Sequence, residues 1–216
     1  MNKDSLLKLL PTAKQDSSLV LLYINIGQQY EISSDLETAK SYYLKARDLS
    51  EKLHYRMGSI KYISNYTYIL NVQEKTDSSL ILNKQALELA KEIGDPLTIA
   101  KCYANIGSSF FHMDIFDSAL VNYQNSRALI EVAADPEMMA RIDDITQNIY
   151  YKMGQYGKAV EMSESALKYY RTSKDSVSLG IVLSNLGNNY VSLGKYAKGL
   201  NIFKEALAIA RSIEYP

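Results

Sequence analysis

The hexapeptide NIGQQY, at Asn25–Tyr30, returns along the chain in closely related forms. It reads NIGSSF at Asn105–Phe110 and NLGNNY at Asn185–Tyr190. The central glycines of the three copies are 80 residues apart: Gly27, Gly107 and Gly187. A glycine inside a helix lowers stability by about 1 kcal/mol relative to alanine. Three glycines at one fixed spacing therefore indicate a position where the fold requires a very small residue.

Half of this interval, 40 residues, is the period, because related segments with Thr67 and Gln147 in the glycine column lie between the three copies. Twelve residues after the glycine column every residue is small: Ala39, Ser79, Ala119, Ala159 and Gly199. Nineteen residues after it they are again small: Ala46, Ala86, Ser126, Ala166 and Ala206. Sixteen residues after it most are aromatic: Tyr43, Asn83, Tyr123, Ser163 and Phe203. Five copies in register indicate a repeat architecture.

Each repeat has the apolar spacing of three and four residues that is typical of amphipathic helices, with a short break near its middle. We expect five antiparallel pairs, or ten helices of roughly 16–18 residues. Because one pair cannot bury both of its faces, the pairs should stack into an all-α superhelix. We expect a lead-in helix or cap over 1–16 and the array over 17–216. The expected repeats are 17–55, 56–95, 96–135, 136–175 and 176–216.

The first repeat resembles the tetratricopeptide repeat through residues of both of its helices: Tyr23, Ile26, Gly27, Tyr30, Ala39, Tyr43 and Ala46. The resemblance covers residues 17–213. The family's usual period is about 34 residues. A 40-residue period resembles the longer-helix subclass, which includes kinesin light chains and peptide-sensing bacterial regulators. This resemblance implies a right-handed superhelix whose first helices line the concave face.

A second resemblance concerns the opening DSLLKLLPTAKQDSS, at Asp4–Ser18. It is similar to the start of sensor regions in large bacterial membrane-anchored signalling and transcription regulators. That similarity implies a fragment of a longer protein that carries an output domain elsewhere. It also implies a periplasmic location, whereas a protein without a membrane anchor would be cytoplasmic.

Composition argues against several classes of function. Lys and Arg together number 24, as do Asp and Glu, so the formal charge is zero. A nucleic-acid-binding surface needs an excess of basic residues, and we expect no nucleic acid partner. No apolar run approaches the roughly 18 residues of a membrane span. His54 and His112 occupy unrelated positions, and we expect no metal, no cofactor and no catalytic residues.

Two further features have ordinary structural explanations. Cys102 is the only cysteine and lies in an apolar helical pattern, which predicts a buried side chain. Asp143 and Asp144 are adjacent on one helix and should point in different directions. A solvated helix face explains this pair better than acid–base chemistry does.

The concave face implied by the resemblance is the expected binding surface. Two residues before the glycine column, amides could hold an extended peptide backbone: Asn25, Asn65, Asn105 and Asn185. One residue after that column the candidates are Gln28, Tyr68, Asn148 and Asn188. Six residues before it, cations could contact an anionic ligand: Lys61, Lys101 and Arg141. Phe111 and Tyr151 could add apolar contacts.

Each set of candidates has a structural alternative. The asparagines could bridge adjacent first helices, the cations could form a solvated face, and the tyrosines could belong to the core. We expect a noncatalytic module that binds a protein or extended peptide segment, as the sensor or partner-binding region of a bacterial regulator. The alternative is a self-associating scaffold or adaptor with no dedicated peptide ligand, with a homodimer as its simplest form.

Overall fold

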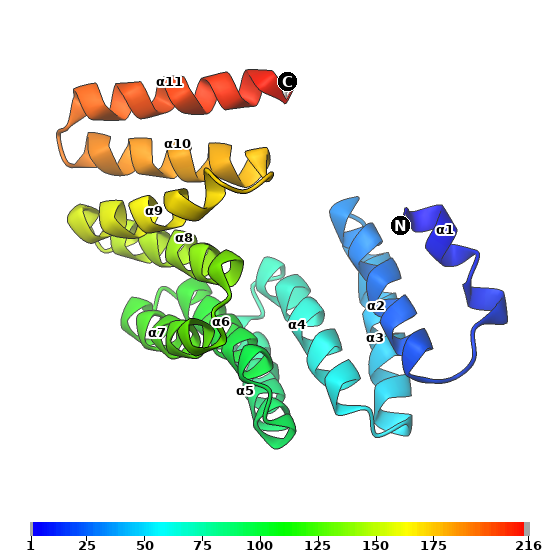
Figure 1. The fold of residues 1–216 in the computed structure, drawn as a ribbon. Coiled ribbons are helices and arrows are strands. Elements are labelled where there is room, and N and C mark those ends of the chain that lie inside the picture. The colour runs from blue at the N-terminus through cyan, green and yellow to red at the C-terminus, as the bar shows by residue number, and fades with distance from the viewer. Residues whose placement is uncertain (1, 214–216) are drawn as a thin grey trace. The chain divides into compact units, whose positions relative to one another are not determined.

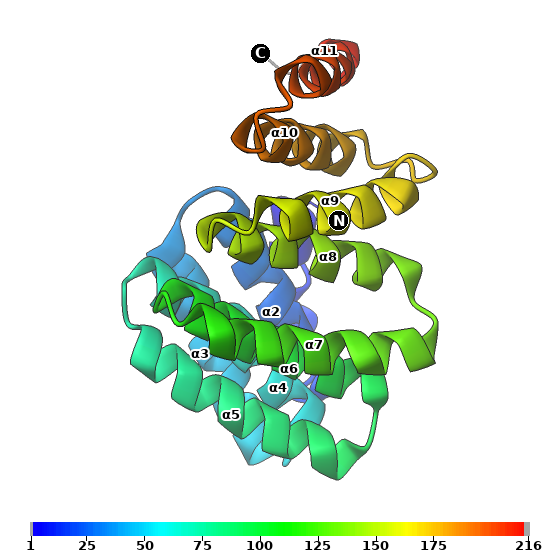
Figure 2. The same cartoon turned by 90° about the vertical axis from the view of Figure 1, so that its left-hand side faces the viewer.

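The protein is helical throughout the part of the chain described by the computed structural model, residues 2–213 (Figures 1 and 2). This range contains eleven α-helices, one 3-10 helix and no strand. The all-α prediction is confirmed. A short helix α1 (Lys3–Leu7) and the 3-10 helix η1 (Leu10–Thr12) precede ten long helices.

The ten long helices alternate between two positions in the 40-residue period. The first helices are α2 (Ser17–Ile32), α4 (Arg56–Val72), α6 (Pro96–His112), α8 (Pro136–Lys152) and α10 (Ser176–Ser192). The second helices are α3 (Leu36–Lys52), α5 (Thr76–Ile93), α7 (Phe116–Ala133), α9 (Tyr156–Tyr170) and α11 (Tyr196–Ser212). From α5 onward each second helix begins 40 residues after the one before it.

Local sequence signals set the ends of these helices. Asp95 and Asp135 cap α6 and α8, each accepting a backbone N–H at its side-chain oxygen, and the next residue is proline. Proline is favourable there because its fixed φ suits the first helical turn. The turns between paired helices place one residue at positive φ at the same repeat position: Ser34, Glu74, Asp114, Gly154 and Gly194.

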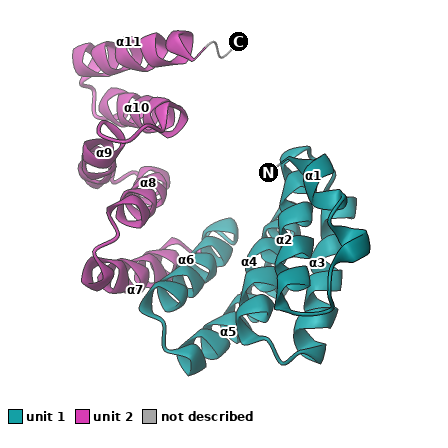
Figure 3. Cartoon of the chain, turned by 45° about the vertical axis from the view of Figure 1, so that its right-hand side comes forward, with its two compact units in different colours: residues 1–114 teal, residues 115–216 magenta. Residues whose placement is uncertain are grey.

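The chain divides into two compact units (Figure 3). Unit 1 comprises residues 1–114 and unit 2 comprises residues 115–216. The division falls inside the predicted repeat 96–135, and the predicted repeat boundaries stay a prediction.

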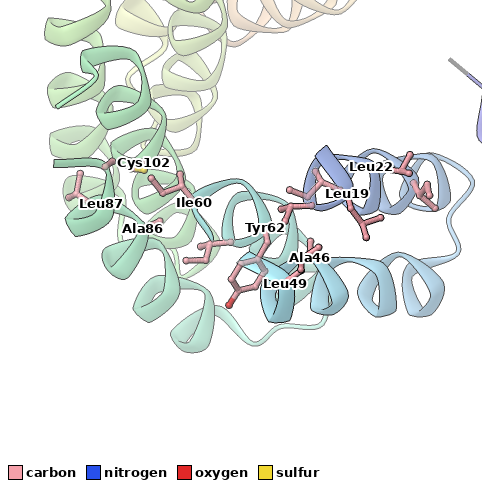
Figure 4. Packing of buried hydrophobic residues seen from close by; sticks show 14 of the residues in the cluster. Leu19, Leu22, Ala46, Leu49, Ile60, Tyr62, Ala86, Leu87 and Cys102 are labelled. Carbon is pink, nitrogen blue, oxygen red and sulfur yellow. The ribbon is translucent and has the colours of Figure 1, made fainter. Parts of the chain in front are cut away.

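In unit 1, side chains from several consecutive helices form one buried cluster (Figure 4). Leu6 of α1 joins this cluster at its N-terminal side, and Cys102 of α6 lies at the other. Burial raises the pKa of the Cys102 thiol to about 11. The prediction that this cysteine is a buried apolar residue is confirmed.

The glycine column allows paired helices to approach closely. A Cβ atom added to Gly27 would lie 2.7 Å from Cδ1 of Tyr43 on the paired helix α3. A Cβ at Gly187 would lie 2.5 Å from Cε1 of Phe203 on α11. The aromatic ring therefore occupies the space that a larger residue in the glycine column would need.

Where the glycine is missing, a polar pair replaces the glycine–aromatic pair. The hydroxyl of Thr67 donates to Oδ1 of Asn83 at 3.3 Å. In the fourth repeat the two positions hold Gln147 and Ser163, and Asn189 Nδ2 donates to both at 2.9 Å. These five side chains are buried, so the hydrogen bonds satisfy polar atoms that water cannot reach, while Gln147 Nε2 and Asn189 Oδ1 are left without a hydrogen-bond partner among the described residues.

We expect Gly27→Ala to destabilise the protein by about 1–3 kcal/mol through overpacking. Tyr43 cannot move aside easily, because its ring is fully buried and its hydroxyl donates to Glu31 at 2.7 Å. The urea midpoint of unfolding measures the loss. Gly157→Ala in α9 is the control, since a Cβ there has no neighbouring atom within 4 Å. Equal midpoints for both variants would contradict the close-approach explanation.

Candidate binding surface

The first helices of each unit lie next to one another, with α2 contacting α4, α4 contacting α6, and α8 contacting α10. We define the first-helix face of a unit as the accessible surface of its first helices that carries the predicted binding columns. All thirteen predicted site residues are at least partly accessible. The exposed ones are Asn25, Lys61, Tyr68, Lys101, Arg141, Tyr151 and Asn188. The half-buried ones are Gln28, Asn65, Asn105, Phe111, Asn148 and Asn185.

In unit 1 the asparagines link neighbouring first helices. Gln28 Nε2 of α2 donates to Asn65 Oδ1 of α4 at 2.9 Å. Asn105 Nδ2 of α6 donates to Ser64 Oγ of α4 at 3.1 Å. Asn25 differs, because it is exposed and makes no side-chain hydrogen bond within the described residues.

Unit 2 uses the same kind of link with a charged acceptor. Asn185 Nδ2 of α10 donates to Asp144 Oδ1 of α8 at 3.1 Å. Asn148 Nδ2 donates within α8, to the backbone oxygen of Asp144, at 3.1 Å. Burial raises the pKa of Asp144, and the hydrogen bond from Asn185 opposes that shift. The asparagine column therefore has a structural use in both units, and its contact with a peptide stays a prediction.

The predicted cationic column is divided between the two units. Lys61 and Lys101 are exposed on α4 and α6 of unit 1, and neither forms an ion pair within the described residues. Arg141 is exposed on α8 of unit 2, where it lines a polar cavity of about 470 Å³ with Lys174 and Asp175. The lysines thus face solvent without an ion pair, although the charge of Lys101 helps to lower the pKa of the Asp95 carboxyl, whereas Arg141 lies among charges of both signs.

Exposed apolar residues accompany the lysines on the first helices of unit 1. On α4, Lys61, Tyr68 and Val72 lie seven and four residues apart, so they share one side of the helix. Tyr68 and Val72 are exposed, and so is Ile32 of α2, which is 40 residues before Val72. Ile32 and Val72 were not among the predicted site residues, although their shared repeat position was a usable signal. They extend the apolar part of the surface beyond the predicted Tyr68, Phe111 and Tyr151.

The two predicted aromatic contacts both have protein neighbours. The ring of Phe111 lies 5.9 Å from the ring of His112, measured between centroids. The ring of Tyr151 lies 5.4 Å from that of Tyr156, and its hydroxyl accepts from Ser192 Oγ at 3.4 Å. Their role toward a ligand stays a prediction.

Asp143 corrects the interpretation of the Asp143–Asp144 pair as a solvated face. Its side chain is 1% exposed, and Oδ1 lies 3.2 Å from Nη1 of Arg127 on α7. Ser165 of α9 donates to Oδ2 at 2.6 Å. Burial raises the pKa of this carboxyl, while Ser165 and Arg127 favour the ionised form. The group links three helices of unit 2, and its burial was not foreseeable from α8 alone.

We expect Arg127→Met to destabilise the protein at neutral pH by about 3 kcal/mol, because it leaves a buried carboxylate without its cation. The pKa of Asp143 in the folded protein is raised above 3.8, its ordinary value, so ionisation of this carboxyl lowers the stability of the fold at neutral pH. That loss of stability disappears as the pH falls toward 3.8 and the carboxyl is protonated in both states. The loss should therefore shrink in acid. Urea unfolding at several pH values measures this.

Arg171→Met provides the matched control for the ion pair. Arg171 and its partner Glu205 are both exposed, at a distance of 3.0 Å. An exposed pair contributes about 1 kcal/mol or less. Equal losses for the two arginine variants would contradict the structural role assigned to Asp143.

The asparagine links make a separate prediction. We expect Asn105→Ala and Asn185→Ala each to lower stability by about 1 kcal/mol through loss of a hydrogen bond between first helices. Asn25→Ala should leave the urea midpoint unchanged. Equal urea midpoints for all three variants would show that the hydrogen bonds between first helices contribute nothing measurable to stability.

No group of three or more His, Cys, Asp or Glu side chains among the described residues could hold a metal ion. None of the helices described is long and apolar enough to cross a membrane.

The repeat geometry agrees with a known family. The tetratricopeptide repeat model matches residues 148–212, which span the end of α8 through α11. These residues are similar to tetratricopeptide repeats, and the described chain has the fold of an array of such repeats. No curated relative matches the chain.

Solved structures with this fold include BtubC from P. vanneervenii, which is 18% identical with a TM-score of 0.78 over 93% of this chain and 83% of BtubC. A Rap protein complexed with Competence and Sporulation Factor has a TM-score of 0.84 at 15% identity, over 98% of this chain and 59% of the Rap chain. A third structure is a Signal Transduction ATPase with Numerous Domains from Pyrococcus horikoshii, which has a tetratricopeptide repeat sensor. It has a TM-score of 0.76 at 22% identity, over 98% of this chain and 33% of the ATPase. At these identities the likeness shows the fold alone.

Proposed function

We propose that this chain is a noncatalytic binding module whose first-helix face in unit 1 captures a protein or peptide segment with acidic and apolar side chains. The observation that carries the proposal is the combination of Lys61 and Lys101 with exposed Tyr68 and Val72 on neighbouring first helices. An acidic group at the lysines and an apolar group at Tyr68 and Val72 would be recognised together.

The asparagine links shape this proposal. Because Asn65 and Asn105 hold neighbouring first helices together, they present a surface whose spacing is set before any ligand binds. A surface that is already ordered loses less conformational entropy on binding. Asn25 has no such link and remains available for a ligand backbone.

The wider role we propose is the sensor or partner-binding region of a bacterial signalling or transcription regulator. Two neighbours support this, since one is a Rap protein in complex with Competence and Sporulation Factor and another is a signal-transduction ATPase with a repeat sensor. Binding would alter the packing of the first helices against the second helices. A self-associating scaffold is the second candidate, supported by the exposed Leu200 and Leu207 of α11.

Two labelled synthetic peptides test the ligand chemistry. One contains Glu, Leu and Ser, and the other has Lys in place of every Glu. We expect the acidic peptide to bind more tightly in a fluorescence anisotropy titration, with an affinity that falls as salt screens the charges. Lys61→Glu or Lys101→Glu should each weaken binding about tenfold, or about 1.4 kcal/mol.

Lys84→Glu is the matched control, because it makes the same charge change at an exposed position of the second helix α5. Its affinity for the acidic peptide should equal that of the unchanged protein within error. Equal binding of the two peptides, or equal weakening by Lys84→Glu and Lys61→Glu, would rule out the lysine site.

A further inference from the structure

Unit 2 contains a polar cavity of about 470 Å³ beside the loop that joins α9 to α10 (Figure 2). We name it the loop cavity and define it by its four charged side chains, Glu137 and Arg141 of α8 with Lys174 and Asp175 of the loop. The end of α9 and the first turn of α10 complete its lining. Its volume lies within the range of small-molecule sites, roughly 300–1,000 Å³.

The cavity lies where the chain departs from its own repeat. The helices α5 and α7 end at one repeat position, Ile93 and Ala133, whereas α9 already ends at Tyr170. Two hydroxyls of the loop bond the last carbonyl oxygens of α9, from Thr172 to Tyr169 at 2.8 Å and from Ser173 to Tyr170 at 3.0 Å. Such local bonds end a helix by satisfying carbonyls that a further turn would have used. The early end of α9 leaves Lys174 and Asp175 in a loop beside α8.

The side chains at this place also differ from those of the other repeats. Tyr169 stands where Leu89 and Leu129 stand in the second and third repeats. Lys174 stands at the position of Gly94, which ends α5 in the left-handed conformation. Those repeats pack without an aromatic ring or a cation at these positions, so packing alone does not account for Tyr169 and Lys174.

The two cations of the loop cavity have no ion-pair partner. Arg141 and Lys174 are both exposed, and neither forms an ion pair within the described residues. Burial raises the pKa of the Tyr170 hydroxyl, the charge of Asp144 adds to the rise, and the charge of Arg141 opposes it. Arg141 therefore lies close to the aromatic part of the lining, with its guanidinium group free to bind an anion.

The two carboxylates are only partly used by the protein. Oδ1 of Asp175 accepts the backbone N–H of Ser178 at 3.0 Å, and the hydrogen bonds from Ser178 lower the pKa of this carboxyl. Burial raises the pKa of the Tyr169 hydroxyl, and the neighbouring carboxylate of Glu137 raises it further. A carboxylate has two oxygens and about four acceptor positions, so both groups can accept further hydrogen bonds.

We propose that the loop cavity binds a small zwitterion, a free amino acid or a dipeptide, with its carboxylate at Arg141 and Lys174 and its ammonium group at Glu137 and Asp175. The lining has two charges of each sign, so a ligand with one charge of each sign pairs with both sets. The planar guanidinium group of Arg141 suits a carboxylate, which it can bind through two parallel hydrogen bonds.

The carboxylates of the lining select against other anions. A phosphate dianion would bring a larger negative charge close to Glu137 and Asp175 and would leave both of them without a cation. The same holds for an anion without an ammonium group. The inference goes beyond the function proposed for unit 1 and does not rest on it, because every lining residue belongs to unit 2.

Isothermal titration calorimetry on the full chain tests the zwitterion, with the standard amino acids and glycylglycine as probes. We expect at least one probe to bind with a millimolar or lower dissociation constant. Analogues of the tightest binder that lack its amino group or its carboxylate should bind about tenfold more weakly. Arg141→Met and Lys174→Met should each weaken binding of the zwitterion about tenfold. Both side chains are exposed, so the variants should fold, which circular dichroism checks.

Glu137→Gln separates the two halves of the ligand. It should weaken binding of the zwitterion about tenfold and leave the affinity for the analogue without the amino group unchanged. Lys168→Met is the matched control for Lys174→Met, because Lys168 is exposed on α9 and does not line the cavity. Its affinity for the zwitterion should equal that of the unchanged protein.

Three results would overturn the proposal. The first is the absence of binding by every probe at millimolar concentration. The second is equal affinity for the zwitterion and for inorganic phosphate or the analogue without the amino group, which would indicate a simple anion site. The third is equal weakening by Lys168→Met and Lys174→Met, which would place the ligand outside the loop cavity.

Discussion

The close approach of paired helices at the glycine column is the constraint on which the packing of each repeat depends. Gly27 leaves room for the Tyr43 ring, and that ring in turn fills the gap between α2 and α3. A packed interior has no spare volume, so a larger residue in one column requires a smaller residue in the other. Gln147 opposite Ser163 shows this exchange in the fourth repeat.

The exchange changes chemistry as well as volume. A buried glutamine must find hydrogen-bond partners, and Asn189 supplies its Nδ2 group to Gln147 and Ser163 from the next first helix. The second repeat does the same with Asn83, which donates to Ser109 Oγ at 3.0 Å. Glycine–aromatic pairs and polar pairs therefore alternate from repeat to repeat, and each polar pair forms a hydrogen bond with the first helix of the next repeat.

The repeat period made the helical organisation predictable, because columns such as Ala46 and Ala86 recur where second helices meet their neighbours. Contacts between repeats were harder to foresee. The burial of Asp143 depends on Arg127, which lies on another helix. The link from Asn105 reaches a residue 41 positions away, and nothing at Asn105 itself distinguishes a link from a ligand contact. Sequence periodicity identifies a column, whereas its use depends on the residue that faces it.

The same logic applies to the last described pair of helices, α10 and α11. In a stacked array each repeat is stabilised by its own packing and by its interfaces with its neighbours, so an outermost repeat has one interface fewer. A repeat adapted to remain outermost would carry polar residues at the stacking positions. Leu200 and Leu207 instead retain the apolar character that Val160 and Leu167 have in the interior.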